Sequence, residues 1–95
     1  MYRAMHWLSD NFHMLLVADW DGEYTVFQPD SGKTHFFNQM SMDMLSFLSQ
    51  RPASTEEICD YLSRQSEQAP DKNFQDNIEK ILYHFDALGL VKKEI

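Results

Sequence analysis

The sequence predicts one α+β domain in which a three-stranded antiparallel sheet precedes a three-helix bundle, with the outline of a winged helix-turn-helix protein. Two observations support this class. Residues 14–37 have the pattern of short strands joined by turns, whereas apolar residues recur at helical spacing from Asn38 onward. A chain of 95 residues is long enough for one hydrophobic core and too short for a deep enclosed active site.

Three strands and two turns make up the predicted sheet. "MLLVAD" (14–19) and "EYTVF" (23–27) flank Asp21-Gly22, where glycine supplies the positive φ that a two-residue hairpin turn requires. "PDSG" (29–32) forms the next turn and leads into Thr34–Phe37, the last strand. The last strand of a meander is an edge strand unless another element covers it.

The first two predicted helices have clear start and stop signals. Asn38 is the expected N-cap of a helix over 39–50, which Arg51-Pro52 ends. Ser54 and Glu57 form a capping box at the start of the second helix. The expected buried positions are Met40, Met44, Leu45, Phe47 and Leu48 in the first helix and Ile58, Tyr61 and Leu62 in the second.

The third predicted helix is the longest and most regular. Asp71 or Asn73 caps its start, and Gly89 stands where a left-handed C-terminal cap belongs, so Leu90-Val91 should fold back onto the last turn. Lys92–Ile95 has the composition of a short charged tail. The apolar face of this helix contains Phe74, Ile78, Ile81, Leu82, Phe85 and Leu88.

Composition and charge favour a cytoplasmic protein that binds neither nucleic acid nor membranes. Apolar residues are 43% of the chain, and the formal net charge is −7, which attracts basic partners and repels phosphate. No apolar run approaches the roughly 18 residues that span a bilayer, and the N-terminal segment lacks a signal-peptide pattern. Because Cys59 is the only cysteine, we expect no disulfide within the chain and no thiolate zinc site.

No combination of residues predicts catalysis, a metal or a cofactor. Cys59 has no neighbouring His or Asp to activate it, so we interpret it as a half-buried structural thiol. His35 and His84 would approach each other if the last strand packs beside the third helix, but two histidines without a carboxylate make a poor metal site. The three glycines serve turns and caps rather than a phosphate loop. We therefore expect a protein that is not an enzyme.

A winged-helix outline also raises DNA binding, which the charges oppose. The third helix offers Asn77 and Lys80, but Asp76, Glu79 and Asp86 share its exposed surface. The whole chain carries 15 acidic residues against 8 basic ones. Repulsion from the phosphates argues against this function.

Peptide binding is the alternative that the last strand suggests. An edge strand can accept an extended peptide by β-augmentation, and alternation places Thr34 and Phe36 on one face and His35 and Phe37 on the other. The third helix has a flank without carboxylates, formed by Asn73, Asn77, Lys80, His84 and Ala87. The residue chemistry equally allows an edge that is merely short and a flank that is merely solvated.

The order of these segments resembles the PqqD-like family, the RiPP recognition elements that bind leader peptides. The resemblance covers residues 14–94 and rests on "HFFNQMSMDMLSFL", "RPASTEEICDYL" and "ILYHFDALGLVKKE". "SGKTHFFN" further resembles a subgroup found beside HPr-kinase-like proteins.

The resemblance implies a non-catalytic domain that holds a peptide and presents it to a partner modification enzyme, which in this subgroup would be kinase-like. The guest would lie as an added strand between the third strand and the third helix. An apolar wall would come from Phe36 or Phe37 with Ile81 and Leu88, and polar selection from Lys80 and His84. The implied peptide-binding residues are Thr34, His35, Phe36, Phe37, Asn77, Lys80, Ile81, His84 and Leu88.

Several alternatives remain open at this point. A minimal recognition element would be the single domain of residues 14–95. Residues 1–13 lie outside this domain and would form an extra strand, cover the edge strand or exchange with a second subunit. The edge strand would equally serve a homodimerising adaptor. A histidine in the site, His35 or His84, would make binding sensitive to pH.

Overall fold

The structure is a computed structural model that describes residues 5–67, 69 and 71–94. These residues form a three-stranded antiparallel sheet and three α-helices, so the α+β class predicted from the sequence is confirmed. Within the described ranges, no helix is both long enough and apolar enough to cross a membrane.

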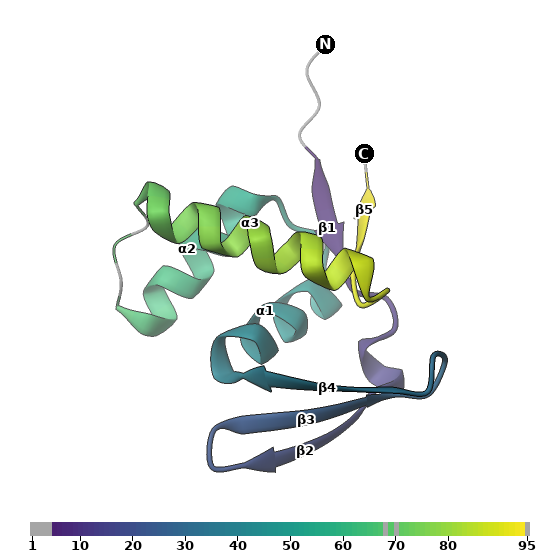
Figure 1. The fold of residues 1–95 in the computed structure, drawn as a ribbon. Helices are drawn as coiled ribbons and strands as arrows, with labels where there is room; N and C mark the ends of the chain where they lie inside the picture. Colours follow the sequence, from purple (N-terminus) through teal and green to yellow (C-terminus); the bar gives the residue numbers. More distant parts are fainter. Residues whose placement is uncertain (1–4, 68, 70, 95) are drawn as a thin grey trace.

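The main sheet is the predicted meander. It consists of β2 (Leu16–Trp20), β3 (Glu23–Gln28) and β4 (Lys33–Asn38), in the order β2-β3-β4. Figure 1 shows β4 nearest the helices and β2 farthest from them. All five residues of β2 are exposed, whereas Val26 at the centre of β3 is fully buried. The sheet therefore joins the core mainly through β3 and β4.

Both turns of the meander have the backbone that the sequence predicts. Asp21 and Gly22 have φ angles of 57° and 88°, the two positive values of a type I′ hairpin turn. In the next turn Gly32 has a φ of 72°, and its N–H donates to the carbonyl of Gln28 at 2.9 Å. Both turns are set by residues that lie within them.

The three helices are α1 (Gln39–Gln50), α2 (Thr55–Ser66) and α3 (Lys72–Ala87), and their predicted caps are confirmed. The side chain of Asn38 accepts the N–H of Ser41 at 2.9 Å. The capping box predicted for α2 is complete. Of the two candidates for the N-cap of α3, Asp71 fills the position and accepts the N–H of Phe74 at 2.9 Å.

The C-terminal end of the chain follows the prediction as far as Val91 and then departs from it. Gly89 has a φ of 77°, the N–H of Leu90 donates to the carbonyl of Phe85 at 2.9 Å, and Leu90 and Val91 are buried. The predicted charged tail was wrong, because Lys92–Glu94 is the strand β5. Its partner lies at the other end of the chain, so nothing local in the sequence identifies it.

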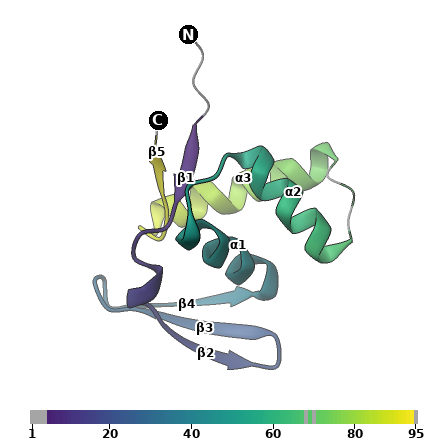
Figure 2. The same cartoon turned by 180° about the vertical axis from the view of Figure 1, so that it is seen from behind.

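The partner of β5 is β1 (His6–Leu8), which pairs with it antiparallel (Figure 2). Trp7 of β1 is only 1% exposed, and its backbone exchanges two hydrogen bonds with Ala53, at 2.8 and 2.9 Å. A 3₁₀ turn, η1 (Phe12–Met14), then leads into β2. Of the roles considered for the N-terminal residues, the described part supplies an extra strand and leaves β4 uncovered; the domain boundary after residue 13 stays a prediction.

The core lies between the three helices, β1 and one face of the main sheet. Its cluster includes Trp7, Val26, Leu45, Ile58, Ile78, Leu82 and Phe85. Two sequence expectations need correction. Cys59 is buried rather than half-buried, and burial raises the pKa of its thiol. Five expected core residues are only partly buried and pack against the core from its margin: Met40, Phe47, Tyr61, Ile81 and Leu88.

Candidate functional site

The free edge of β4 is the feature from which the candidate site is built. β4 pairs with β3 on one side and is the last strand in its sheet among the described residues. On its other side, Figure 1 shows α3 running across the molecule next to this edge. An uncovered edge strand offers unpaired backbone N–H and C=O groups.

The type I′ turn determines which backbone groups face this edge. In such a turn the carbonyl of Trp20 accepts the N–H of Glu23, so these residues form a hydrogen-bonded pair of β2 and β3. Backbone groups of successive strand residues point in opposite directions within an antiparallel sheet. Alternate residues of β3 therefore bond to β2 and β4, and Val26 belongs to the set that bonds to β4.

The partner of Val26 on β4 is His35. The same alternation directs the backbone groups of His35 and Phe37 toward β3. We therefore expect the N–H and C=O groups of Thr34 and Phe36 to point away from β3. These two residues are the positions where an added strand would pair.

The side chains of β4 divide between two faces of the sheet, which we name by their neighbours. The helix face carries His35 and Phe37: the Phe37 ring makes an edge contact with Phe85 of α3, at 5.2 Å between ring centroids. His35 and Phe37 stack on each other at 5.7 Å. The outer face carries Phe36, which is 78% exposed. Of the two candidates for the apolar wall, Phe37 therefore lies toward α3 and Phe36 points away from it.

Two hydrogen bonds of the Gln28 side chain connect β4 to the end of α3. Gln28 Nε2 donates to the carbonyl of Leu88 at 3.2 Å, and Gln28 Oε1 lies 2.9 Å from His35 Nε2. Because the amide oxygen can only accept, His35 Nε2 is the protonated nitrogen of the ring. Gln28 is 5% exposed and was not among the predicted site residues. The two-residue period of β3 could have identified it, since it shares the face of Val26.

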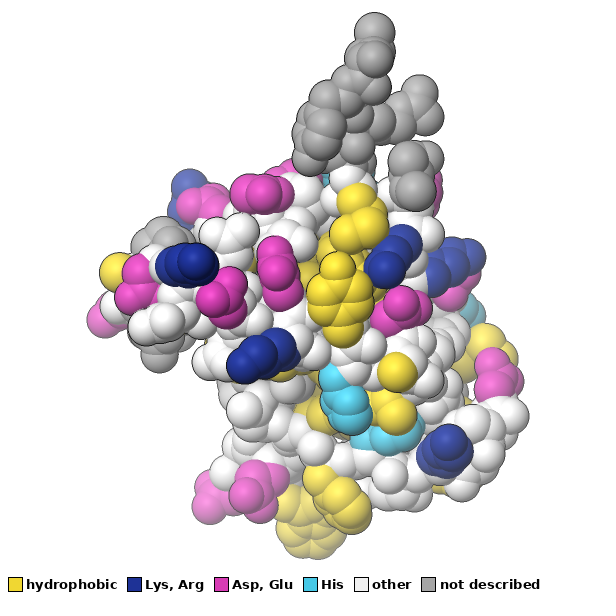
Figure 3. Space-filling view, turned by 45° about the horizontal axis from the view of Figure 1, so that its top comes forward, with side chains coloured by type: hydrophobic (Ala, Val, Ile, Leu, Met, Phe, Trp, Pro, Cys, Tyr) yellow, Lys and Arg dark blue, Asp and Glu magenta, His cyan; other side chains and the backbone are white. Residues whose placement is uncertain are grey.

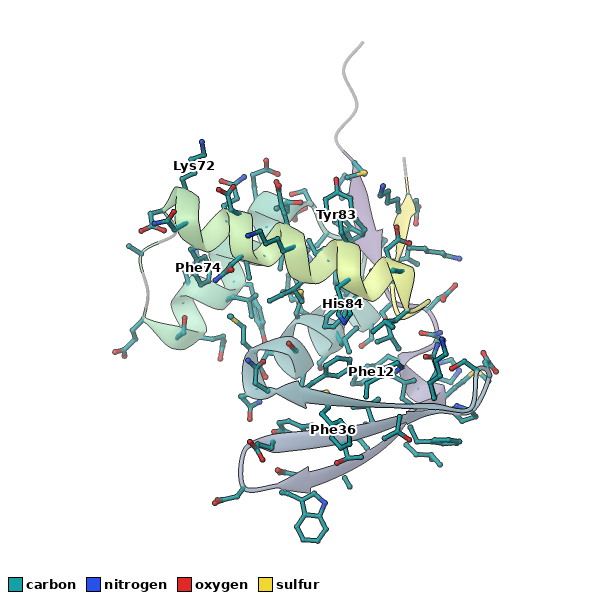
Figure 4. All side chains as sticks on the ribbon, in the orientation of Figure 1. Phe12, Phe36, Lys72, Phe74, Tyr83 and His84 are labelled. Carbon is teal, nitrogen blue, oxygen red and sulfur yellow. The ribbon has the colours of Figure 1, made fainter. Side chains whose placement is uncertain are left out.

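The histidine pair anticipated from the sequence is present between β4 and α3. Burial lowers the pKa of His35, and the charges of Lys33 and His84 lower it further. Figure 4 shows His84 on the side of α3 that is turned toward the sheet, and Figure 3 shows histidine side chains side by side next to hydrophobic ones. Within the described ranges, no group of three or more His, Cys, Asp or Glu side chains could hold a metal ion.

The remaining predicted residues lie along α3. Ile81 and Leu88 are partly buried and pack against the core, whereas Lys80 and His84 are exposed. Asn77 is nearer the start of the helix, where it helps to line a hollow of about 400 Å³ together with Asn73 and Phe74. The structure thus brings His35, Phe37 and His84 together, leaves Asn77 at one end and turns the side chain of Phe36 to the outer face.

Comparisons with known proteins support the fold. No family model matches the chain, and no curated protein matches it. A solved structure, TbiB1 in complex with the TbiA(beta) leader peptide, has the same fold with a TM-score of 0.65 at 15% sequence identity. The match covers 82% of this chain and 88% of TbiB1. At this identity the likeness establishes a shared fold.

Proposed function

We propose that this protein is a non-catalytic peptide-recognition domain of the PqqD-like type, which binds an extended segment along β4 and α3 and presents it to a modification enzyme. The observation that carries the proposal is the free edge of β4 beside a helix flank with apolar and polar residues. The fold shared with TbiB1, whose structure is a complex with a leader peptide, supports it.

In the proposed complex, the guest adds a strand to the sheet. Its backbone pairs with Thr34 and Phe36, and alternate guest side chains point toward the helix face. These side chains meet Phe37, Ile81 and Leu88, while Lys80 and His84 select polar groups of the guest. Main-chain bonds with two or three apolar contacts correspond to dissociation constants of roughly micromolar or below.

Gln28 gives the site a fixed geometry before the guest arrives. Its two hydrogen bonds tie His35 on β4 to the end of α3, so the strand and the helix that form the two walls are connected. A preorganised site loses less entropy on binding than one that orders with its guest.

The partner enzyme is the least specified part of the proposal. The resemblance of "SGKTHFFN" to the subgroup beside HPr-kinase-like proteins makes a kinase-like enzyme the first partner to test. The net charge of −7 favours basic surfaces on any such partner.

The test compares two substitutions of one residue. Phe36→Pro removes a backbone N–H on the open side of β4, where proline is compatible with an edge strand, while Phe36→Ala keeps that N–H and removes only the ring. A segment recovered with the wild-type domain from the native cytosol is titrated into each variant. We expect Phe36→Pro to weaken binding by about tenfold or more and Phe36→Ala to bind nearly normally.

Amide hydrogen exchange provides the site-specific readout of this test. A guest on β4 should protect the amides of Thr34 and Phe36, while His35 is protected already by its bond to β3. Equal binding by both variants, with protection elsewhere, contradicts strand addition. NMR spectra of each free variant establish that the fold is retained.

The same edge also fits a homodimerising adaptor. In that case, the amides of Thr34 and Phe36 become protected as the protein concentration rises, without any guest. Sedimentation equilibrium of the wild type and of Phe36→Pro separates the two functions, because only a dimer formed through β4 dissociates in the variant.

A further inference from the structure

The sheet carries a second hollow, which extends from the outer face to the end of β4, where Phe36, Phe37 and Asn38 help to line it. It has a volume of about 610 Å³ and is lined by residues that include Trp20, Glu23, Thr25 and Phe36. The two aromatic residues are among the most exposed apolar side chains, at 70% for Trp20 and 78% for Phe36. Figure 4 shows Phe36 on the sheet, well away from α3.

The strand register places a carboxylate between the two rings. Trp20 is directly opposite Glu23, and Phe36 is opposite Thr25, which makes Phe36 a diagonal neighbour of Glu23. Directly opposite side chains in a sheet are roughly 5 Å apart at Cβ and diagonal ones roughly 7 Å. All three side chains therefore border one hollow from the same face.

The charges around the hollow are acidic. The hairpin of residues 16–28 contains Asp19, Asp21 and Glu23 and has no Lys or Arg, and no basic residue lines the hollow. Figure 3 shows acidic side chains beside hydrophobic ones at the lower end of the molecule. Aromatic faces attract cations through their quadrupoles, and a carboxylate pairs with them.

We propose that this hollow binds a basic side chain, arginine or lysine, of a partner protein. The aromatic rings would flank the aliphatic stem and the cation, and Glu23 would pair with the charge. This inference goes beyond the peptide site on β4 and does not depend on it. The backbone of Phe36 belongs to the edge, and its ring belongs to the hollow.

A second copy of this chain is a poorer occupant. Two sheets packed through their outer faces would bring the acids of both hairpins together, and like charges brought together at an interface destabilise it. A basic partner instead gains from the net charge of −7.

The test uses two blocked pentapeptides, acetyl-Gly-Gly-Arg-Gly-Gly-amide and the same peptide with citrulline, which keeps the shape of arginine without its charge. Binding is followed by NMR on the labelled full chain, where the indole N–H of exposed Trp20 is distinct from that of buried Trp7. We expect the arginine peptide to shift the Trp20, Glu23 and Phe36 signals with a millimolar dissociation constant. The citrulline peptide should bind roughly threefold to fivefold more weakly.

Variants separate the hollow from general charge attraction. Glu23→Gln should weaken arginine binding roughly threefold, and Trp20→Ala should abolish the shifts of Glu23 and Phe36. Glu56→Gln on α2 removes one exposed acid elsewhere and should leave binding unchanged. Three results would each overturn the proposal. The arginine and citrulline peptides bind equally well, or Glu56→Gln weakens binding as much as Glu23→Gln does. The third result is that the Trp20 signal shifts as the protein concentration rises with no peptide present. Phe36→Ala, which keeps the backbone N–H of the β4 edge and removes the ring, should also weaken binding of the arginine peptide.

Discussion

Phe36 and Phe37 are neighbours in the chain and lie in two different environments. Phe37 stacks on His35 and contacts Phe85 in the core, whereas Phe36 is 78% exposed on the outer face. The same contrast holds for the faces themselves: Val26 and Gln28 are buried on one, and Leu16 and Trp20 are exposed on the other. Apolar residues therefore stabilise the helix face, while those of the outer face remain available for contacts with other molecules.

The largest expected effect separates the two phenylalanines. Phe37→Ala removes the contacts with His35 and Phe85, so we expect it to lower the free energy of unfolding by about 2–3 kcal/mol, less than for a fully buried phenylalanine. Phe36→Ala should change it by no more than about 0.5 kcal/mol. Urea denaturation followed by circular dichroism measures both. An equal loss of unfolding free energy in both variants would show that the Phe36 ring is also buried in solution, against another part of the protein or a second molecule.

The next effect concerns Gln28, which connects the helix face to α3. Gln28→Ala leaves His35 Nε2 and the Leu88 carbonyl without their partner, and we expect a loss of about 1–3 kcal/mol. Gln65→Ala, an exposed glutamine on α2, serves as the matched control and should cost less than about 0.5 kcal/mol. An unchanged free energy of unfolding in Gln28→Ala would mean that water replaces both hydrogen bonds. In that case, Gln28 does not couple β4 to α3.

The smallest effect is the pH dependence of His35. Its pKa is lowered in the folded protein by burial and by the charges of Lys33 and His84, while the unfolded chain keeps the ordinary value of 6.5. Below pH 6.5 the unfolded state binds more protons, so this contribution to stability is complete above pH 6.5 and is lost as the pH falls.

The measurement is the midpoint of urea denaturation between pH 7.5 and 5. His35→Gln should flatten the dependence in that window, whereas Gln65→Ala, which removes an exposed side chain of α2 that does not titrate, should leave it unchanged. An identical pH profile for wild type and His35→Gln would assign the effect to other groups.

Much of the fold could be predicted because its signals are local. Asn38, Ser54 and Asp71 cap helices by bonding backbone within three residues of themselves. Asp21-Gly22 and Gly89 mark positive φ angles that other residues rarely adopt. Each of these features needs only a short stretch of chain.

The candidate site was predicted in part. The sequence identified β4 and the flank of α3, and its nine residues stay a prediction for peptide binding. It did not identify Gln28, whose partners Leu88 and His35 come from a helix and another strand. The sequence analysis also did not predict the hollow beside Trp20, because the residue pattern of a strand does not distinguish an exposed aromatic residue from a buried one.

The sequence by itself determined the turns, the caps, the helical periods and the alternation that places Phe36 and Phe37 on opposite faces. Only the tertiary structure decided which of them faces the helices, because alternation is symmetric until one face is covered. It also decided the pairing of β1 with β5 and the burial of Trp7 against Ala53. These contacts join distant parts of the chain, so burial of apolar surface in the completed fold selects them rather than any local backbone preference.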